Sequence, residues 1–243
     1  MLALNKGRYR ARIAQTPQDV AAAQALRALA FGTGAECDID DFDAICTHIL
    51  IEDSREDAVV CCFRFLPLTG GAEIGRSYAA QFYDLDALLD FEGPIVEMGR
   101  FCIHPDARDG DILRVAWAAM TQYVDDNGVE LLCGCSSFAG TETKDYLDAF
   151  AMLKARHLAP KRWLPRVKAP AVFQFAKKLR RKPDAKKAML RMPPLLRTYL
   201  LMGGWVSDHA VVDSHMNTLH VFTGLEIKSI PPARKRLLRA VAR

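Results

Sequence analysis

The sequence predicts an α/β fold built around a strand–helix–strand unit. Residues 94–103 form an apolar run of strand length, and residues 129–136 form a second one. Between them, residues 111–126 have the apolar spacing of a helix, which ends at Asn127-Gly128. A further helix is expected over 141–157. Two strands joined by a helix pack into one sheet, so the predicted architecture is a central sheet flanked by helices.

Helix and strand signals also precede this unit. Thr16-Pro17-Gln18-Asp19 offers a capping hydroxyl, a proline for the first helical position and an acid near the helix N-terminus. A helix is therefore expected to run from there to about Phe31. Strands are expected over 8–15, 47–52, 58–66 and 73–82, the last three as antiparallel hairpins, with a final strand over 217–222.

The composition fits one domain in a reducing compartment. The chain has 243 residues, of which 50% are hydrophobic. We expect a single domain over 1–243, with a core in 1–158 and with a basic segment and closing elements in 159–243. Seven cysteines, mostly in apolar runs and without C-x-x-C spacing, predict buried reduced thiols and no metal site. With no signal-peptide pattern and no run of roughly 18 apolar residues, a cytoplasmic protein is expected.

Positive charge is concentrated in one segment. Residues 154–191 contain fourteen Lys or Arg and one acid, although the formal net charge of the chain is +4. Because like charges repel, a solvated helix face is a poor explanation for so long a run of one sign. The segment therefore predicts an anionic partner, which is an acidic protein, a membrane surface or nucleic acid. Its aromatic residues alternate as in a strand or core, which disfavours nucleic acid.

Glu97 and Arg100 are the first candidates for chemistry, because they interrupt an otherwise apolar strand. Charged side chains are rarely buried unless they are paired or functional. A carboxylate here could deprotonate an amine nucleophile or bind a substrate ammonium group. The alternative is a structural ion pair. Three positions apart, the two side chains point to opposite faces of the strand unless a bulge intervenes.

Further candidates lie beside the strand–helix–strand unit. The loop His104–Gly110 precedes a helix N-terminus, where phosphates bind readily, and Arg108 and Gly110 suit that use. The alternative is an ordinary turn. Ser136 and Tyr146 could stabilise an oxyanion or protonate a leaving thiolate, although such residues are more often caps and turn formers. The chain lacks the G-x-G-x-x-G, G-K-[ST], G-x-S-x-G and H-E-x-x-H patterns of several other enzyme classes.

The stretch Val96–Pro105 (VEMGRFCIHP) resembles the central strand of the GNAT superfamily. The chain is also similar to the L-ornithine N-alpha-acyltransferases, which begin ornithine-lipid synthesis. The Glu-x-x-Arg pattern is shared with acyl-homoserine-lactone synthases, which have the same fold. The stretches that carry the similarity to the ornithine acyltransferases are Gln24–Phe31, Leu132–Phe138, Leu195–Asp213 and Asn217–Leu225.

This resemblance implies a GNAT-like mixed, splayed sheet flanked by helices, with a basic helical or irregular C-terminal extension. The phosphopantetheine arm of a thioester donor would lie between two central strands, and no permanently bound cofactor is implied. Glu97 and Arg100 match the Glu-x-x-Arg pair, and the 104–110 loop matches the phosphate-binding turn. The residues implied to bind the donor arm are Phe101, Ile103, His104, Arg108 and Gly110.

The loop departs from the [RQ]-x-x-G-x-[GA] pattern of acetyl-CoA binders, because it reads Arg108-Asp109-Gly110-Asp111-Ile112-Leu113. Asp109 and Asp111 would repel the pyrophosphate of CoA. An acyl carrier protein has one phosphodiester and an acidic surface, so the departure favours it as donor. The basic segment would then dock the carrier electrostatically. The expected docking residues are Lys161, Arg162, Lys177, Lys178, Arg180 and Arg181.

The resulting hypothesis is an N-acyltransferase that moves a 3-hydroxy fatty acyl group from acyl carrier protein to the α-amine of an amino acid. Ornithine is the expected acceptor, and glutamine is the alternative. The catalytic candidates are Glu97, Arg100, Ser136 and Tyr146. Rival hypotheses are an acetyl-CoA-dependent acetyltransferase, an autoinducer-type synthase, and a non-catalytic basic module. The apolar stretch Leu195–Trp205 is expected to be a core helix or a contact with the inner membrane face.

Overall fold

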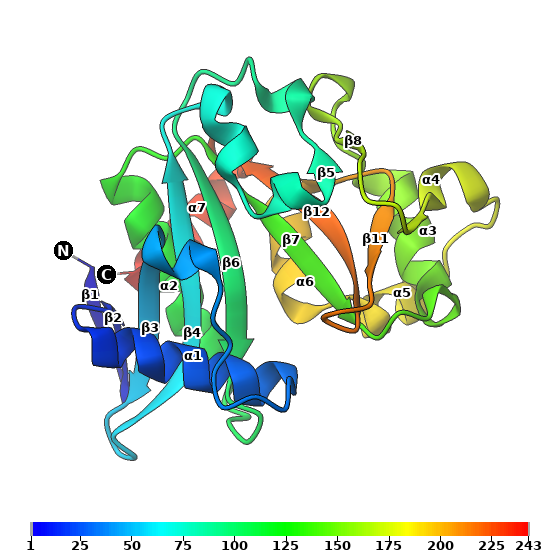
Figure 1. Ribbon diagram of the computed structural model, residues 1–243. Coiled ribbons are helices and arrows are strands. Elements are labelled where there is room, and N and C mark those ends of the chain that lie inside the picture. The colour runs from blue at the N-terminus through cyan, green and yellow to red at the C-terminus, as the bar shows by residue number, and fades with distance from the viewer. Residues whose placement is uncertain (1, 243) are drawn as a thin grey trace. The chain divides into compact units, whose positions relative to one another are not determined.

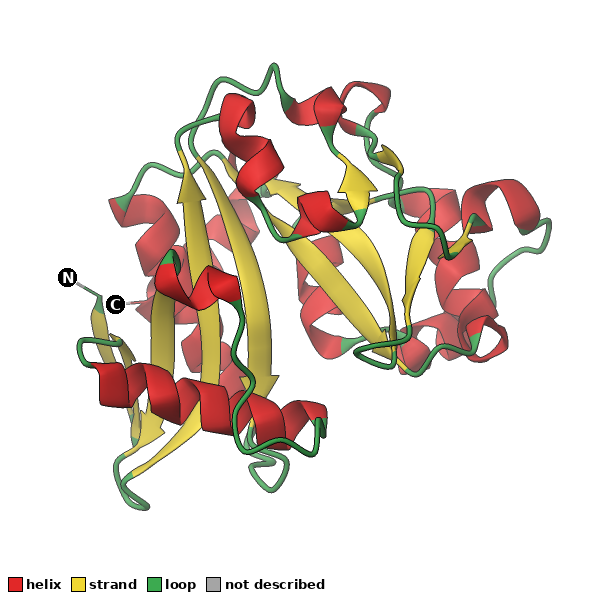
Figure 2. Ribbon diagram, viewed as in Figure 1, coloured by secondary structure: helices red, strands yellow, loops and turns green. Residues whose placement is uncertain are grey.

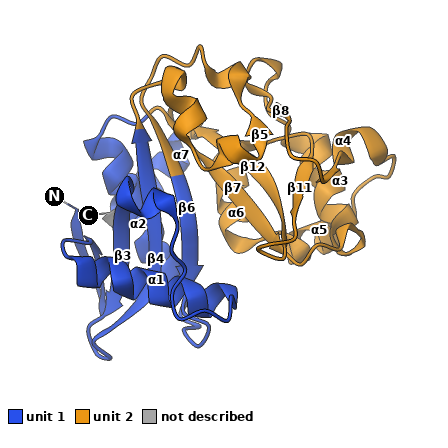
Figure 3. Cartoon of the chain, viewed as in Figure 1, with its two compact units in different colours: residues 1–67, 98–129, 232–243 blue, residues 68–97, 130–231 orange. Residues whose placement is uncertain are grey.

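The computed structural model describes residues 2–242, which form two compact units that interleave along the chain (Figure 1, Figure 3). Unit 1 comprises Met1–Pro67, Met98–Val129 and Pro232–Arg243, and unit 2 comprises Leu68–Glu97 and Glu130–Pro231. Neither unit coincides with the expected division at residue 158, because the C-terminal helix belongs with the N-terminal strands. The expectation of one domain over 1–243 stays a prediction.

Unit 1 contains strands in the order β1-β2-β3-β4-β6. Helix α1 crosses one face of these strands, and α2 and α7 cover the other (Figure 1). The elements are β1 (Ala3–Lys6), β2 (Tyr9–Ile13), α1 (Pro17–Phe31), η1 (Asp41–Ala44), β3 (Thr47–Asp53), β4 (Ala58–Leu68), most of β6 (Ile95–Ile103), α2 (Gly110–Asp126) and α7 (Pro232–Ala242).

The predicted start of helix α1 is confirmed. Thr16 is the N-cap, and its hydroxyl accepts a hydrogen bond from the N–H of Asp19 at 3.1 Å. The carboxylate of Asp19 in turn accepts from the N–H of Thr16 at 3.1 Å, which completes a capping box. The predicted pairing of β3 with β4 is also confirmed, since these strands are antiparallel with Leu50 opposite Cys62.

Unit 2 contains strands in the order β6-β7-β12-β11-β9, with β10 also paired to β12, and a separate pair β5-β8 (Figure 2). The elements are η2 (Gly71–Arg76), η3 (Ala79–Gln81), β5 (Tyr83–Asp84), η4 (Asp86–Leu88), the start of β6, β7 (Leu131–Ala139), η5 (Thr143–Tyr146), α3 (Leu147–Arg156), η6 (Lys161–Trp163), β8 (Arg166–Val167), β9 (Val172–Phe173), α4 (Phe175–Lys178), α5 (Ala185–Arg191), α6 (Pro194–Leu201), β10 (Trp205–Val206), β11 (Ala210–Asp213), β12 (Thr218–Glu226) and η7 (Ile227–Ser229).

The two faces of the unit 2 sheet are covered by different elements. On one face, Leu219 and Val221 of β12 join a buried cluster with Phe150 of α3, Ala188 of α5 and Leu196 of α6. On the other face, the ring of Tyr83 in β5 packs on His220 and Phe222 of β12. Alternating residues of one strand therefore serve two separate layers of packing.

Strand β6 runs parallel to β7, whereas the pairs β7–β12, β12–β11 and β11–β9 are antiparallel, so the sheet is mixed. The β6–β7 register covers Ile95–Glu97 opposite Leu131–Cys133, the first three residues of each nine-residue strand. Pairing confined to the start of two long strands is the feature expected of a splayed sheet. Glu97 is both the last paired residue and the last residue of unit 2 on this strand.

The prediction of a strand over 73–82 is wrong. Those residues form η2 and η3 instead. The backbone at Gly71 packs so closely on η4 that a Cβ atom there would lie 1.8 Å from the carbonyl oxygen of Leu88. The short helices also turn the backbone amides of Tyr78 and Ala79 toward a side chain of β6, which an extended strand would not do.

The apolar stretch 195–205 is largely a core element, which was one of its two expected forms. Leu196, Tyr199, Met202 and Trp205 are all at most 5% exposed, while Leu201 is 54% exposed. Among the helices of residues 2–242, none has the length and apolarity to cross a bilayer. Contact of this stretch with a membrane surface stays a prediction.

The cysteines predict a simple chemical measurement. Cys61, Cys62, Cys102 and Cys133 are buried, and burial raises the pKa of the Cys61 thiol, which slows its reaction further. A thiol reagent at neutral pH is therefore expected to modify at most the three half-buried cysteines of the native protein, and all seven in denaturant. Rapid native modification of more than three thiols would contradict the packing described for both units.

Candidate active site

Glu97 is a buried carboxylate, 4% exposed, at the end of the part of β6 that pairs with β7. Its Oε2 accepts a hydrogen bond from the backbone N–H of Tyr78 at 2.6 Å, and its Oε1 accepts from that of Ala79 at 2.8 Å. Hydrogen bonds to a charged acceptor are short and strong, so the two amides offset the cost of burying the carboxylate. Glu97 is thus fixed in position by the backbone at the start of η3.

The register of the sheet identifies the side chains that share a face with Glu97. Glu97 lies opposite Cys133 of β7, and paired residues point to the same face. Because side chains alternate along β7, Cys135 also lies on this face. Burial and the nearby charge of Glu97 raise the pKa of the Cys133 thiol well above its usual value. This thiol stays protonated at neutral pH and is a poor nucleophile.

The predicted grouping of Ser136 and Tyr146 with Glu97 is not found. Alternation along β7 places Ser136 on the opposite face, where it pairs with Val221 and accepts a hydrogen bond from Thr223 Oγ1 at 2.9 Å. The hydroxyl of Tyr146 donates to the carbonyl oxygen of Ala139 at 2.6 Å, and its ring packs in the cluster beneath α3. Both residues therefore have structural partners away from the carboxylate.

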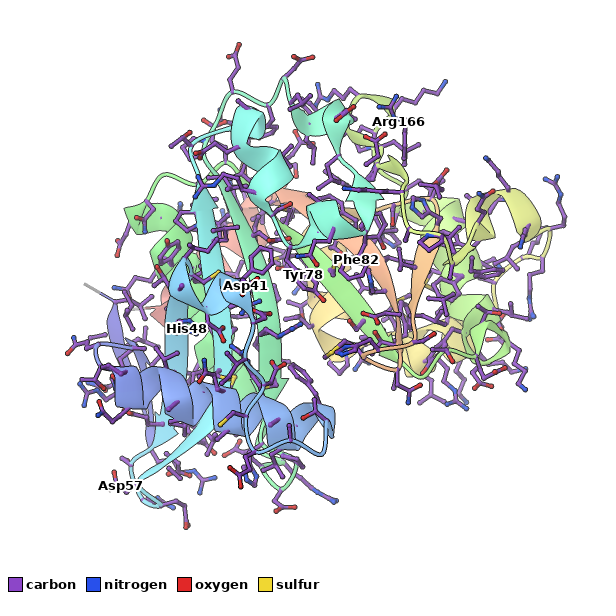
Figure 4. The ribbon with its side chains drawn as sticks, in the orientation of Figure 1. Asp41, His48, Asp57, Tyr78, Phe82 and Arg166 are labelled. Carbon is purple, nitrogen blue, oxygen red and sulfur yellow. The ribbon has the colours of Figure 1, made fainter. Side chains whose placement is uncertain are left out.

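An aromatic pair accompanies the turn that holds Glu97. The rings of Tyr78 and Phe82, both labelled in Figure 4, have centroids 5.3 Å apart. Next to them, the hydroxyl of Tyr83 donates to the carbonyl oxygen of His220 at 2.8 Å. Burial lowers the pKa of His220 to about 4, so this imidazole is neutral at physiological pH. These contacts tie β5 and η3 to the sheet of unit 2.

Arg100 lies three residues after Glu97, within unit 1, and has an unusual backbone. Its φ of 52° is in the left-handed region, which is uncommon for residues other than glycine and typical of a bulge within a strand. The guanidinium group pairs with Asp38 at 3.0 Å and with Asp40 at 2.9 Å. The strict alternation that predicts opposite faces does not hold at such a residue. The catalytic role of Arg100 stays a prediction.

Asp38 and Asp40 belong to a larger buried network in unit 1. Asp43 accepts from Arg27 Nη1 at 2.7 Å and from Arg64 Nη1 at 2.5 Å. The side chains of Arg27 and Arg64 are 1% and 3% exposed. Burial alone would raise the pKa of Asp43, but the hydrogen bonds and charge of Arg27 outweigh it, so the pKa of Asp43 is lowered.

This network is not among the features predicted from the sequence, although two signals point to it. Arg64 interrupts the apolar run of β4 much as Glu97 and Arg100 interrupt β6, and Arg27 lies on the buried side of α1. The acids come from the stretch Glu36–Asp43, which the sequence predicts as a loop or a short helix and whose end forms η1. Spacing along the chain does not show that these arginines and acids meet.

The implied donor-arm residues occupy the end of β6 and the start of α2. Phe101 stacks on Phe63 with ring centroids 5.7 Å apart, and His104 Nδ1 accepts from the N–H of Asp106 at 3.2 Å. Asp109 is the N-cap of α2 and accepts from the N–H of Asp111 at 2.9 Å. That backbone hydrogen bond, together with a hydrogen bond from the side chain of Tyr9, lowers the pKa of Asp109.

This capping leaves a negative charge at the helix N-terminus where a phosphate would otherwise bind. Arg108 and Gly110 are exposed beside it, and Ile103 is half-buried. A carboxylate that already accepts from an amide in the first turn of α2 competes with any anionic ligand for that donor. The implied binding roles of Phe101, Ile103, His104, Arg108 and Gly110 stay predictions.

The basic segment lies entirely in unit 2, and part of its charge is neutralised there. Arg162 pairs with Glu226 at 3.3 Å, and Arg181 pairs with Asp148 at 2.7 Å. Within the part of the chain that the structure describes, Lys161, Lys177 and Arg180 form no ion pair. Lys178 lies over the ring of Phe173 at 6.0 Å.

The fold and the site define the class of protein. The acetyltransferase (GNAT) domain family matches residues 25–118. FeeM, an N-acyl amino acid synthase from uncultured soil microbes, has a similar structure with a TM-score of 0.51 at 12% identity, covering 92% of this chain and 94% of that one. The loading GNATL domain of CurA from Lyngbya majuscula gives 0.50 at 16% identity, covering 90% and 98%. The chain thus has the GNAT fold, and the predicted fold class is confirmed.

Sequence relatives identify the family. An L-ornithine N(alpha)-acyltransferase from Rhodobacter capsulatus is 33% identical over 239 residues, which cover 91% of both chains. A protein of the same name from Rhizobium meliloti is 28% identical, covering 90% of this chain and 80% of the relative. The chain belongs to the L-ornithine N(alpha)-acyltransferase family and is an N-acyltransferase, which confirms the resemblance and excludes the non-catalytic alternative.

The buried network predicts a stability effect. Asp43→Asn would leave the buried guanidinium groups of Arg27 and Arg64 short of one negative partner, so it is expected to lower the free energy of unfolding by about 3 kcal/mol at neutral pH. Urea denaturation measures this quantity. Asp41→Asn is the control, because Asp41, labelled in Figure 4, is an exposed neighbour on η1.

The same effect should depend on pH with a definite sign. The pKa of Asp43 is lower in the folded protein than in the unfolded chain, so its ionised form stabilises the fold above its ordinary pKa of about 4. That contribution is lost as the pH falls below about 4, and the difference between Asp43→Asn and wild type should shrink there. An equal penalty at all pH values would contradict the lowered pKa.

Proposed function

We propose that this chain transfers a 3-hydroxy fatty acyl group from the phosphopantetheine thioester of an acyl carrier protein to the α-amine of ornithine. The product would be a lyso-aminolipid. The family supports the acceptor, because the relatives named above are called L-ornithine N(alpha)-acyltransferases. The observation that carries the chemistry is Glu97, a buried carboxylate held by two backbone amides.

Glu97 is suited to an ammonium group in two ways. A carboxylate oxygen can accept more than one hydrogen bond, and the fixed position avoids the cost of ordering the side chain at the moment of reaction. In the proposed step, Glu97 takes a proton from the α-ammonium group, and the free amine attacks the thioester carbonyl. The C–N bond forms, the attacking nitrogen loses its second proton to solvent, the C–S bond breaks, and solvent protonates the leaving thiolate. Ser136 and Tyr146 have no part in this step.

Two features support a carrier-protein donor over CoA. The capping carboxylate of Asp109 occupies the helix N-terminus at which a pyrophosphate would be expected to bind. Asp111 lies beside it and pairs with Arg114 at 2.5 Å. Both acids repel the single phosphodiester of a carrier-bound arm less strongly than they repel the pyrophosphate of CoA.

The surface of α5 supports docking of an acidic carrier. Leu190 is 78% exposed and Met189 is 39% exposed. Lys186 and Lys187 precede Leu190 by four and three positions, so they lie next to it on the same side of the helix. An exposed leucine surrounded by cations suits a partner that has an apolar patch for the leucine and acidic residues around it for the lysines. The proposed docking surface therefore comprises Lys161, Arg162, Lys177, Lys178, Arg180 and Arg181, together with Lys186, Lys187, Met189 and Leu190 of α5.

The activity itself is tested by comparing donors and acceptors. The purified protein is given 3-hydroxyacyl-acyl carrier protein, the matching acyl-CoA or acetyl-CoA, with ornithine or glutamine as acceptor. Acyl-ornithine formed fastest from the carrier is the expected result. A preference for acetyl-CoA would overturn the donor proposal, and a preference for glutamine would overturn the acceptor proposal while retaining the reaction.

The role of Glu97 predicts a large loss of turnover on Glu97→Gln. Removal of a general base typically slows a reaction by at least about 100-fold, so kcat should fall by that order in an acyl-transfer assay. Glu73→Gln is a matched control, because Glu73 also accepts a backbone N–H, from Thr69 at 2.7 Å, but lies on the surface of unit 2. Near-wild-type turnover of a folded Glu97→Gln variant would contradict the proposed role of Glu97 as general base.

The docking surface predicts a change in KM for the carrier. Reversing the charge of Lys177 and Lys178 to Glu is expected to raise that KM about tenfold at low salt, with a smaller effect at high salt. Arg234→Glu/Arg236→Glu makes the same change in net charge on exposed residues of α7. An equal effect of both double variants would indicate long-range attraction by net charge and argue against a defined docking surface.

A further inference from the structure

Ser77 is a buried hydroxyl, 2% exposed, with no role in the chemistry proposed above. It lies between η2 and η3, directly before the two amides that hold Glu97. Its Oγ donates to the carbonyl oxygen of Ile74 at 2.7 Å and accepts from the N–H of Ala80 at 3.2 Å. The hydroxyl therefore joins the end of η2 to the start of η3.

Three successive backbone amides at this turn have side-chain oxygens as partners. The N–H groups of Tyr78 and Ala79 donate to Glu97, and the N–H of Ala80 donates to both the hydroxyl and the backbone carbonyl oxygen of Ser77, each at 3.2 Å. The first amides of a short helix have few partners within it, so side chains help to determine where they point. Ser77 directs the third amide to itself and leaves the first two for the carboxylate.

The far side of the same turn is held by the basic segment. Lys168 Nζ donates to the carbonyl oxygen of Ala80 at 2.6 Å, and the N–H of Ala169 donates to the carbonyl oxygen of Phe82 at 3.0 Å. Both residues follow β8 in unit 2. The turn is thus fixed at its start by Ser77 and at its end by residues almost ninety positions later in the chain.

We propose that Ser77 and Lys168 are positioning residues for Glu97, an inference that rests on the role proposed for that carboxylate. Neither residue bonds to Glu97 directly, and both act through the turn 77–82. If the turn loosens, the amides of Tyr78 and Ala79 no longer define the place of the carboxylate. A displacement of a reacting group by a fraction of an ångström slows a reaction well before it unfolds a protein.

The test compares Ser77→Ala with Ser207→Ala. Ser207 is also a buried hydroxyl of unit 2. Besides a hydrogen bond with the side chain of Tyr83, it makes the same two kinds of bond, donating to the carbonyl oxygen of His209 at 2.7 Å and accepting from the N–H of Phe222 at 3.1 Å. The two variants should therefore lose similar thermal stability. Ser77→Ala is expected to lower kcat about tenfold with KM for the acyl carrier unchanged, and Ser207→Ala to leave kcat within about twofold.

Lys168→Met provides a second variant that does not remove a buried group, since Lys168 is at the surface. It is expected to lower kcat about threefold without changing KM for the carrier, with Lys144→Met, an exposed lysine of η5 outside the basic segment, as its control. A raised KM at unchanged kcat would instead place Lys168 on the docking surface and overturn its positioning role.

The outcomes separate this inference from the proposed function. If Glu97→Gln abolishes turnover but folded Ser77→Ala has wild-type kcat, the positioning inference fails and the function stands. Equal losses of kcat in Ser77→Ala and Ser207→Ala would also overturn it, because the effect would be general destabilisation. If Glu97→Gln itself has wild-type turnover, the proposed role of Glu97 is wrong, and the positioning inference that rests on it is wrong as well.

Discussion

Strand β6 carries two charged residues, Glu97 and Arg100, in positions where a charge without a partner would be costly. Each is neutralised by groups from distant parts of the sequence. Glu97 accepts hydrogen bonds from two backbone amides of the turn before β5. Arg100 forms ion pairs with two acids that follow α1. The segments that supply these partners are therefore constrained in conformation, and this requirement explains why residues 73–82 form short helices.

Much of the fold could be predicted because its signals are local. The capping box of Thr16, the hairpin of β3 and β4 and the strand–helix–strand unit each depend on residues close together in sequence. The exceptions depend on tertiary contacts. The turn at Ser77 exists because its amides meet Glu97, and the left-handed backbone of Arg100 has no signature in the sequence around it.

The candidate site was predicted in the same uneven way. Glu97 and Arg100 were identifiable because charged residues are rarely buried in an apolar strand unless they are paired or functional. Ser136 and Tyr146 were chosen by residue type, and the register of β7 and the bond of Tyr146 to Ala139 separate both from the carboxylate. The pairing of Arg27 and Arg64 with Asp43 could not be found by spacing, because its members come from the separate elements α1, β4 and η1.

Ornithine offers two amines, so the site of acylation tests the proposed reaction most directly. Tandem mass spectrometry of the product made from ornithine and 3-hydroxyacyl-acyl carrier protein distinguishes the two nitrogens. An acyl group on the α-nitrogen alone is the predicted result. A product acylated on the δ-nitrogen, or no acylated ornithine while the carrier thioester is consumed, would contradict the proposed reaction.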